Sequence, residues 1–330
     1  MREMLTVELI LRAEQPVHHG DGNFGNSAVI KRRRFQSADG SVGDVPYVSG
    51  TSMAHHLREA GSYALLEAAG LLEDPQLTEA AQRLLLNGGQ VKGSSKALTR
   101  AEADELVELL PHIALLGGCV SNTIREGMTW SDSVLLVCEE TAPFLPEWVG
   151  TWLEEQGRRL TPEAALIAVE EGMRRTLDDH PKATRLLSSG ARADMDERLA
   201  KRERASRDDD DAAKLAAKSD AMIFEYETVI MGSLWYWRIA CEVWSAIERD
   251  AFWVMLGAYL ANPHIGGKSK RGFGRVSVVE MRGTSLPTFE RPDPDAVTIN
   301  GINSPELARY VAHVSERRER IRDFLARVVA

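Results

Sequence analysis

A stretch rich in glycine and cations, IGGKSKRGFGRV, lies near the carboxyl end of the chain. From Ile265 to Arg275 it contains four glycines, four cations and no acid. Glycine lets the backbone adopt positive φ and lets a large ligand approach bare amides, and the cations supply charge for a polyanion. We therefore predict that this loop binds phosphate. The candidate contacts are Gly266, Gly267, Lys268, Lys270 and Arg271.

The alternative for this loop is a solvated turn without a ligand, since glycine pairs are common in turns. Its spacing fits neither the dinucleotide-binding pattern G-x-G-x-x-G nor the P-loop. Both of those motifs precede a helix, whereas this loop precedes an alternating apolar segment typical of a strand. A nucleotide cofactor is not expected, and no other cofactor is indicated.

A second basic cluster lies in a short strand predicted from 28 to 35. Its cations are consecutive: Lys31, Arg32, Arg33 and Arg34. Soon afterwards, Ser49, Thr51 and Ser52 are candidates to cap a helix predicted over about 51–69. The first amides of a helix have no partner within it, so the amino end of a helix attracts anions. The two clusters and this helix end predict a groove for phosphates.

Composition limits the class of protein. The chain has 330 residues, of which 44% are hydrophobic, enough for one large domain with insertions or for two ordinary domains. The formal net charge of -9 argues against nucleic acid, but phosphate contacts depend on a local basic stripe. No signal peptide or bilayer span is indicated, so we expect a cytoplasmic protein without a membrane partner. Three widely spaced cysteines suit reduced thiols, and no metal is expected.

Hydrophobic periodicity predicts the elements that position these residues. The predicted strands are 4–12, 131–139, 222–231, 234–243 and 276–281, with 222–231 and 234–243 forming a hairpin. The predicted helices are 76–87, 100–117, 146–187 with breaks, 244–260 and a final one from about 304. Residues 191–218 are so highly charged that they predict a protruding insertion. The order of the elements predicts an α+β fold with a ferredoxin-like, RRM-like core, the split βαβ arrangement.

Three segments together resemble the RAMP superfamily of CRISPR proteins, and within it the Cas-seven family of repeating backbone subunits. Pro16–Gly20 is similar to the family's Pro-x-His-x-Gly-type segment after the first strand. Pro46–Ser52 is similar to Pro-Tyr-[Ile/Val]-Pro-Gly-[Ser/Thr]-Ser, and Ile265–Val276 to Ile-Gly-Gly-x-x-x-x-Gly-[Phe/Tyr]-Gly-x-Val. Their order and placement on matching elements favour the resemblance. The chain looks closest to the type IV backbone subunit.

The resemblance implies a palm core with large helical finger and thumb insertions. The implied parts are 1–69 for the first half of the palm, 70–130 for the finger, 131–145 for a core strand, 146–221 for the thumb, 222–282 for the second half of the palm and 283–330 for a tail and helix. It also implies that His55 and Arg58 join the RNA contacts. Apolar residues of the thumb are candidates to wedge between bases: Leu186, Leu187, Met195 and Met222.

The partners that the resemblance implies are guide (CRISPR) RNA, target nucleic acid, other CRISPR effector subunits and head-to-tail copies of this chain. A ferredoxin-like core offers two unlike edges, and heterologous contacts that do not close into a ring generate a helical filament. Five tryptophans are candidates for such contacts or for the core: Trp148, Trp152, Trp235, Trp237 and Trp244.

The chain departs from family members that cut RNA. Asn26 stands where those members have an aspartate, and Asp21 lies out of register. A neutral amide cannot replace a carboxylate as base or metal ligand, so we expect no catalytic residue and no enzyme. One alternative is a guide-processing endoribonuclease of the same superfamily with a histidine as acid or base, for which His18, His19, His55 and His56 are available. Another alternative is a scaffold that binds only protein.

Overall fold

The structure is a computed structural model that describes residues 2–24, 27–36, 40–72, 77–90, 97–120, 123–175, 190–194, 196–197, 221–284, 286 and 305–328. It divides into two compact units. The first unit comprises Met1–His19, Lys31–Leu166 and Val229–Ala330. The second comprises Gly20–Ile30 and Ile167–Thr228, so residues 146–166 group with the first unit.

The first unit is built on a seven-stranded sheet in the order β13-β1-β12-β9-β5-β4, with β8 pairing to β12. The strands are β1 (Glu3–Ala13), β4 (Arg32–Gln36), β5 (Val42–Val48), β8 (Thr129–Ser131), β9 (Val134–Leu136), β12 (Leu234–Val243) and β13 (Val276–Gly283). With α1 (Gly50–Ala68) and α9 (Ala246–Leu260), the chain order is β1, α1, β9, β12, α9, β13. The last strand lies beside the first, and the third lies between the first and the second. This is the split βαβ arrangement, so the predicted ferredoxin-like core is confirmed.

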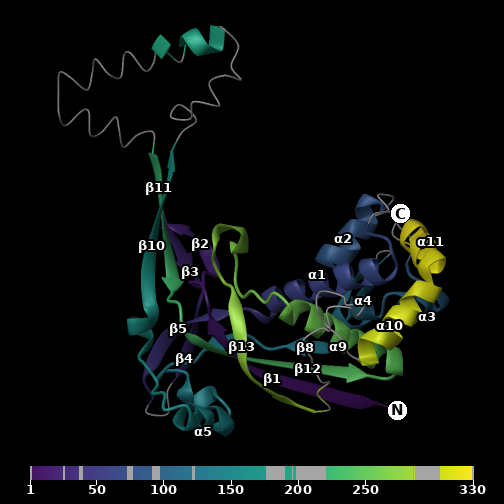
Figure 1. Cartoon of the computed structure of the whole chain (residues 1–330), viewed down its shortest axis with the longest axis horizontal. Coiled ribbons are helices and arrows are strands. Elements are labelled where there is room, and N and C mark those ends of the chain that lie inside the picture. The colour runs from purple at the N-terminus through teal and green to yellow at the C-terminus, as the bar shows by residue number, and fades with distance from the viewer. Residues whose placement is uncertain are drawn as a thin grey trace, which may run out of the picture. The chain divides into compact units, whose positions relative to one another are not determined.

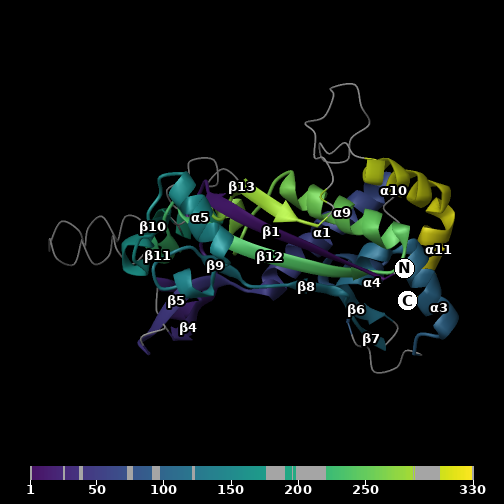
Figure 2. The ribbon, with the colours of Figure 1, turned by 90° about the horizontal axis from the view of Figure 1, so that it is seen from below.

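Alternation along β1 and β12 creates the main core. Leu5, Val7 and Leu9 of β1 are fully buried and face the same side of the sheet. Their partners on β12 are Cys241, Ile239 and Trp237. Figures 1 and 2 show α1 and α9 along this face, and the Trp237 ring lies 5.6 Å from the ring of Tyr259 on α9. The apolar faces of both helices therefore pack on the same side of the sheet.

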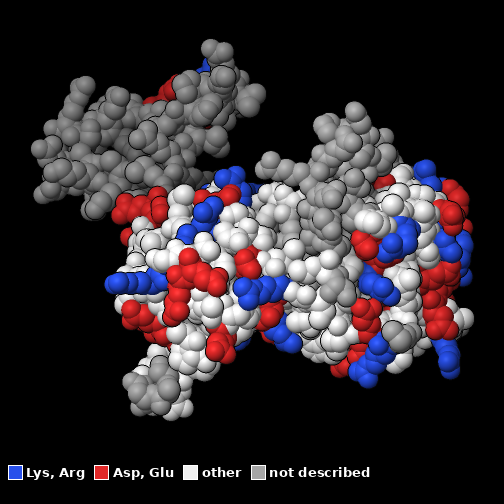
Figure 3. Space-filling view, turned by 60° about the horizontal axis from the view of Figure 1, so that its bottom comes forward, with Lys and Arg blue, Asp and Glu red and all other residues white. Residues whose placement is uncertain are grey.

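The described residues cover only part of the opposite face of the sheet. Helix α5 (Glu147–Glu155) packs against Ile10, Leu234 and Tyr236 at one end of it. Toward the other end, charged side chains are paired, as in Arg238 with Asp132 at 3.2 Å. Figure 3, in which the underside of the first view comes forward, shows Lys and Arg interspersed with Asp and Glu. This face is not a continuous basic surface.

Further helices pack at the end of the first unit. They are α2 (Glu79–Asn87), α3 (Arg100–Leu109), α4 (Pro111–Leu116), α10 (Pro305–Glu316) and α11 (Arg318–Val328), with the hairpin β6 (Gly117–Val120) and β7 (Thr123–Glu126). The Glu108 carboxylate accepts from Arg317 at 2.8 Å and from Arg320 at 2.8 and 2.9 Å. These hydrogen bonds hold the pKa of Glu108 down at about 2. Arginines of the carboxyl-terminal helices thus hold α10 and α11 to α3.

The second unit is a four-stranded sheet in the order β10-β11-β3-β2. Its strands are β2 (Gly20–Phe24), β3 (Ser27–Ile30), β10 (Ile167–Arg175) and β11 (Ala221–Val229). β11 runs parallel to β3, with Glu225 opposite Ser27, and the Ser27 hydroxyl donates to the Glu225 carboxylate.

Several predictions of secondary structure are wrong. The strand predicted from 28 to 35 is two strands in different sheets, β3 and β4, and the helix predicted over 100–117 is divided into α3 and α4. The hairpin of 222–231 with 234–243 does not form, because β1 occupies one edge of β12 and β8 and β9 occupy the other. The helical thumb pattern from 146 to 187 holds for α5, but 167–175 is strand β10 paired along β11. Asn26, Leu186, Leu187 and Met195 lie outside the described residues, and Met222 lies in β11. None of the described helices is long and apolar enough to cross a bilayer.

A buried histidine makes the fold sensitive to acid. His112 of α4 is fully buried, and its Nε2 lies 3.0 Å from the Ser62 hydroxyl, which itself donates to the Leu85 carbonyl. Burial, with help from the nearby Arg58 charge, lowers the pKa of His112 to about 3. The unfolded chain therefore binds a proton between pH 6.5 and about 3 that the folded chain does not, so stability falls as pH falls through this window.

We predict that wild-type protein loses about 2 kcal/mol of its free energy of unfolding through this residue between pH 7.5 and 5. H112Q should be less stable at pH 7.5 but should lose correspondingly less between the two pH values. Urea unfolding at both pH values measures this. An equal loss in H112Q and wild type would show that His112 does not cause the acid sensitivity.

Candidate nucleic-acid interface

The glycine-rich loop lies against the segment that follows β1. Gly274 N donates to Pro16 O at 2.9 Å, and Gly267 N donates to His18 O at 2.8 Å. The loop also closes on itself, because Ile265 N donates to Gly274 O at 2.8 Å. Two of the three sequence motifs are therefore joined through their backbones.

The close approach of these backbones requires glycine at two positions. Gly266 and Gly274 have φ of 76° and 82°. A Cβ on Gly266 would lie 2.6 Å from His18 O, and one on Gly274 would lie 2.2 Å from Ile265 O. Gly272 also has positive φ, 85°, but nothing lies within 4 Å of its Cβ position. Part of the glycine content thus serves packing within the protein and not approach of a ligand.

The third motif, Pro46–Ser52, and the helix that follows it contact the other two motifs through His19 and His56. Ser49 N donates to His19 Nε2 at 3.3 Å, so the Nδ1 of His19 carries the proton when the ring is neutral. His56 Nε2 lies 3.2 Å from Gly266 O and donates to it. Burial lowers the pKa of His56 below its ordinary value, although the hydrogen bond to Gly266 opposes this. The amino end of α1 is therefore fixed to both other motifs.

The predicted cap of α1 is present, and it uses part of the predicted phosphate site. The Ser49 hydroxyl accepts from Ser52 N at 3.3 Å and from the Thr51 hydroxyl at 3.1 Å. The amide of Ser52 is therefore engaged within the cap. The first turn contains no acid, so the positive end of the helix dipole is not neutralised there. Thr51 and His55 are exposed, and both lie in this first part of α1.

The arginines of the second basic cluster point to opposite faces of strand β4. Arg32 pairs with Glu163, and Arg34 pairs with Asp44 at 3.3 Å. Arg33 points to the other face, where its guanidinium lies 4.3 Å from the centre of the Tyr47 ring. Successive residues of a strand alternate in direction, which separates Arg33 from Arg32 and Arg34, and Lys31 lies just before the strand. The cluster is not a uniform row of cations toward a ligand.

The backbone of Lys31 contacts two of the three motifs. Its amide donates to His19 O at 2.6 Å, and its carbonyl accepts from Tyr47 N at 3.3 Å. The Tyr47 ring lies 6.3 Å from the His19 ring, edge to face. His19 and Tyr47 thus organise this surface, and neither was among the predicted contacts. Their positions within the Pro16–Gly20 and Pro46–Ser52 motifs were the available signal.

Arg58 is a correction to the predicted site. It is 9% exposed, and its guanidinium donates to Gly117 O at 2.9 Å and to Leu116 O at 3.4 Å. Burial lowers its pKa to about 10. Arg58 lies one turn beyond His55 on α1, where the helix faces the interior, so it binds the carbonyl end of α4 and is not placed for RNA.

The cations of the loop lie on a short 3-10 helix, η4 (Ser269–Arg271). Lys268 precedes it in the left-handed conformation, with φ of 61°, and is the only described residue other than glycine with positive φ. Burial and the neighbouring Arg271 charge lower the pKa of Lys268 below its ordinary value. Lys270 and Arg271 are exposed. A conformation that brings like charges together favours an anion between them.

The structure thus brings together Lys31, Arg33, the capped start of α1 and the loop Gly266–Arg271. It turns Arg32 and Arg34 toward acids and buries Arg58. Within the described ranges, no group of three or more His, Cys, Asp or Glu side chains is arranged to hold a metal ion.

Comparison with solved structures supports the fold. A chain in a structure titled "Type IV-B CRISPR Complex" is similar to this one with a TM-score of 0.50 and 19% sequence identity. The similarity covers 89% of this chain and 96% of the other. No protein-family model and no curated protein matches the sequence. The chain therefore has the fold of a type IV CRISPR complex subunit, and the predicted resemblance is confirmed at the level of fold.

Gly272 and Gly274 have similar φ but different surroundings, so together they provide a test of the loop geometry. G272A should cost about 1 to 2 kcal/mol, the penalty of a left-handed alanine in open space. G274A should cost clearly more, because the backbone of Ile265 or of Pro16–His19 must also move. Urea unfolding of the two variants measures the difference. Equal costs would show that the loop does not depend on the close approach at Gly274.

Proposed function

We propose that this chain is a non-catalytic CRISPR RNA-binding backbone subunit. Copies of it would polymerise head to tail along a guide RNA within a multisubunit effector ribonucleoprotein in the cytoplasm and support pairing with target nucleic acid. The observation that supports this proposal most is the junction of three motifs, where the loop Gly266–Arg271, the start of α1 and the backbone of Lys31 are fixed by hydrogen bonds to His18, His19 and His56.

The contacts that we propose are to phosphate and sugar. Exposed cations on a fixed loop and an amino end of a helix without acids attract the RNA backbone, and neither reads a base edge. A subunit that repeats along a guide can make contacts of this kind at every position. The palm, finger and thumb assignments of the sequence prediction remain part of this proposal, with residues 1–69 and 222–282 as the palm.

The histidine endoribonuclease is the less favoured alternative. His18 is buried, His19 accepts from Ser49 N, and His56 donates to Gly266 O. The side chains of His19 and His56 fix the backbone of the site, and the buried His18 ring packs 6.2 Å from the ring of Phe273. His55 is the exposed member of the set, and one histidine alone does not supply both the acid and the base of a ribose-directed cleavage.

Charge reversal of the loop tests the proposed contacts. K270E with R271E should weaken binding of single-stranded RNA of any sequence, because each lost phosphate contact lowers the slope of log affinity against log salt by about 0.7. Fluorescence anisotropy at several salt concentrations measures both quantities. The double variant R158E with R159E makes the same charge change at exposed positions beside α5 and should change the slope little. Equal effects of the two variants would mean that only net charge matters.

The open part of the sheet offers a surface for another copy. Met4, Trp130 and Trp244 are 46%, 51% and 53% exposed. The register of β1, β8 and β12 places Met4 and Trp130 on the face opposite α1 and α9. By contrast, Trp235 and Trp237 are buried on the helix side, and Trp152 lies in the α5 core. Of the five tryptophans considered for self-contact, Trp244 is the exposed one at this patch.

W130A with W244A should therefore reduce assembly on long RNA while leaving the affinity for a short oligonucleotide unchanged. Sedimentation velocity with a long and a short RNA distinguishes the two. The exposed Ile124 of β7 lies on a different sheet, so I124A serves as the control. Unchanged assembly in the double variant would place the contact between copies elsewhere.

A further inference from the structure

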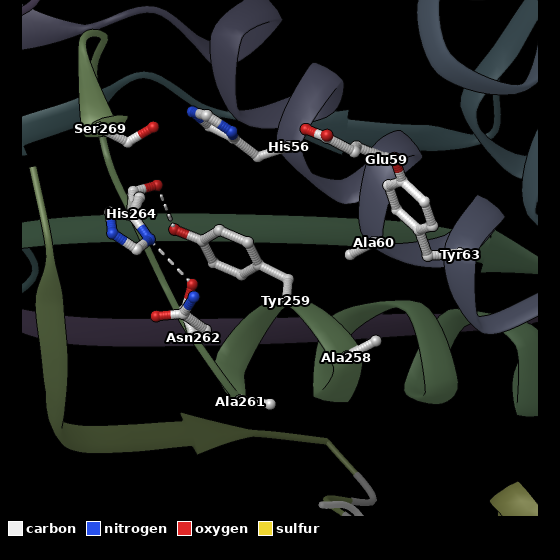
Figure 4. Close-up of a pocket in the computed structure, with 10 residues that line it drawn as sticks. All are labelled: His56, Glu59, Ala60, Tyr63, Ala258, Tyr259, Ala261, Asn262, His264 and Ser269. Carbon is white, nitrogen blue, oxygen red and sulfur yellow. Dashed lines mark hydrogen bonds between the residues drawn. The ribbon is translucent and has the colours of Figure 1, made fainter. Parts of the chain in front are cut away.

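A pocket lies beside the basic loop, between α1 and α9. Its volume is about 450 Å³, within the range of small-molecule sites. Figure 4 shows Tyr259 at its floor, with Tyr63 and Glu59 from α1 on one side and His264 and Asn262 from the end of α9 on the other. Ser269 closes it at the start of η4, directly between Lys268 and Lys270 in sequence.

The walls of the pocket offer aromatic surface. Tyr63 is 44% exposed, although α1 is otherwise buried along its apolar face. The Tyr259 ring is nearly parallel to the His56 ring, with 6.3 Å between centroids. The Tyr259 hydroxyl is already engaged, since it donates to His264 O at 3.0 Å. Tyr259 is 5% exposed, so its ring forms part of the floor, and Tyr63 offers the larger aromatic surface.

The rim of the pocket is polar and has a definite charge pattern. Glu59 contributes a carboxylate on the α1 side, and Asn262 contributes an amide on the α9 side. The cations of the site lie outside the pocket, on the loop from Lys268 to Arg271. A phosphate is repelled by Glu59 but attracted by the loop. A group that donates hydrogen bonds suits the pocket, since a carboxylate is only an acceptor.

We infer that this pocket holds one nucleobase with an exocyclic amino group, while the phosphate of the same nucleotide lies on the loop Lys268–Arg271. The ring of the base would stack on Tyr63 above the floor formed by Tyr259, and its amino group would donate to Glu59. Adenine, cytosine and guanine carry such an amino group, whereas uracil has only a ring N3–H donor flanked by two carbonyl oxygens that repel a carboxylate. This deepens the proposed function, on which it rests in assigning the nucleotide to the bound RNA.

The experiment compares RNA octamers of adenosine, cytidine and uridine at one salt concentration by fluorescence anisotropy. Wild-type protein should bind the adenosine and cytidine octamers about threefold to tenfold more tightly than the uridine octamer. E59Q should bring these affinities close together, because glutamine offers both a donor and an acceptor. Y63A should weaken binding of all three octamers by about fivefold or more through loss of stacking.

Matched variants separate the pocket from general effects on α1. Glu67 is exposed two turns beyond Glu59 on the same helix and does not line the pocket, so E67Q should keep the wild-type preference. Ala261 lines the pocket at the end of α9 and is exposed, so A261W should fill the pocket without removing a polar group. It should abolish the preference at an unchanged midpoint of thermal unfolding.

The outcomes separate this inference from the proposed function. If wild-type protein binds RNA but shows no preference, or if E59Q keeps the preference, the pocket inference is wrong and the proposed function stands. If wild-type protein binds no RNA, the proposed function fails. Equilibrium dialysis with AMP and UMP then decides on the pocket. Binding of AMP over UMP that A261W removes supports the pocket, and absence of AMP binding overturns it.

Discussion

The arrangement of the candidate site depends on one close approach, between the backbone of the glycine-rich loop and the backbone of Pro16–His19. Gly274 N bonds to Pro16 O and Gly267 N to His18 O, and the absent side chains of Gly266 and Gly274 make that approach sterically allowed. Because β1 ends just before Pro16 and β13 begins at Val276, the contact lies at the ends of two paired strands. The ends of two paired strands thus position the basic loop.

The two faces of the ferredoxin-like core have different surroundings. One face is filled by α1 and α9, whose ends meet the loop, so the phosphate site and the pocket both arise on the helix side. The other face has α5 at one end and paired charges with exposed aromatic side chains at the other. Ion pairs on that face reduce its attraction for a polyanion, and the exposed Trp130 and Trp244 favour contact with protein.

The sequence was sufficient for the core, because the apolar segments 4–12, 234–243 and 244–260 and the helical spacing in 51–69 are local signals that the structure follows. It was insufficient where pairing is decided at long range. The 222–231 segment pairs with β10 and β3 instead of β12, whose edges are taken by strands about a hundred residues or more distant in the chain.

The sequence predicted which segments form the candidate site, but not which of their side chains face a ligand. Four consecutive cations cannot all face one ligand from a strand, and that alternation predicts the separation of Arg33 from Arg32 and Arg34. The burial of Arg58 depends on α4, whose carbonyl end lies nearly sixty residues later. Its role could not be read from α1 alone. Likewise, the link from His19 to Ser49 requires knowledge of how the loop after β1 folds.

The most direct test of the central claim is ultraviolet crosslinking of the protein to a guide RNA, with the crosslinked peptides located by mass spectrometry. The account predicts crosslinks concentrated in the loop from Gly266 to Arg271, at the start of α1 and around Tyr47. Crosslinks concentrated instead on the sheet face of Met4, Trp130 and Trp244, with none at the loop, would contradict it.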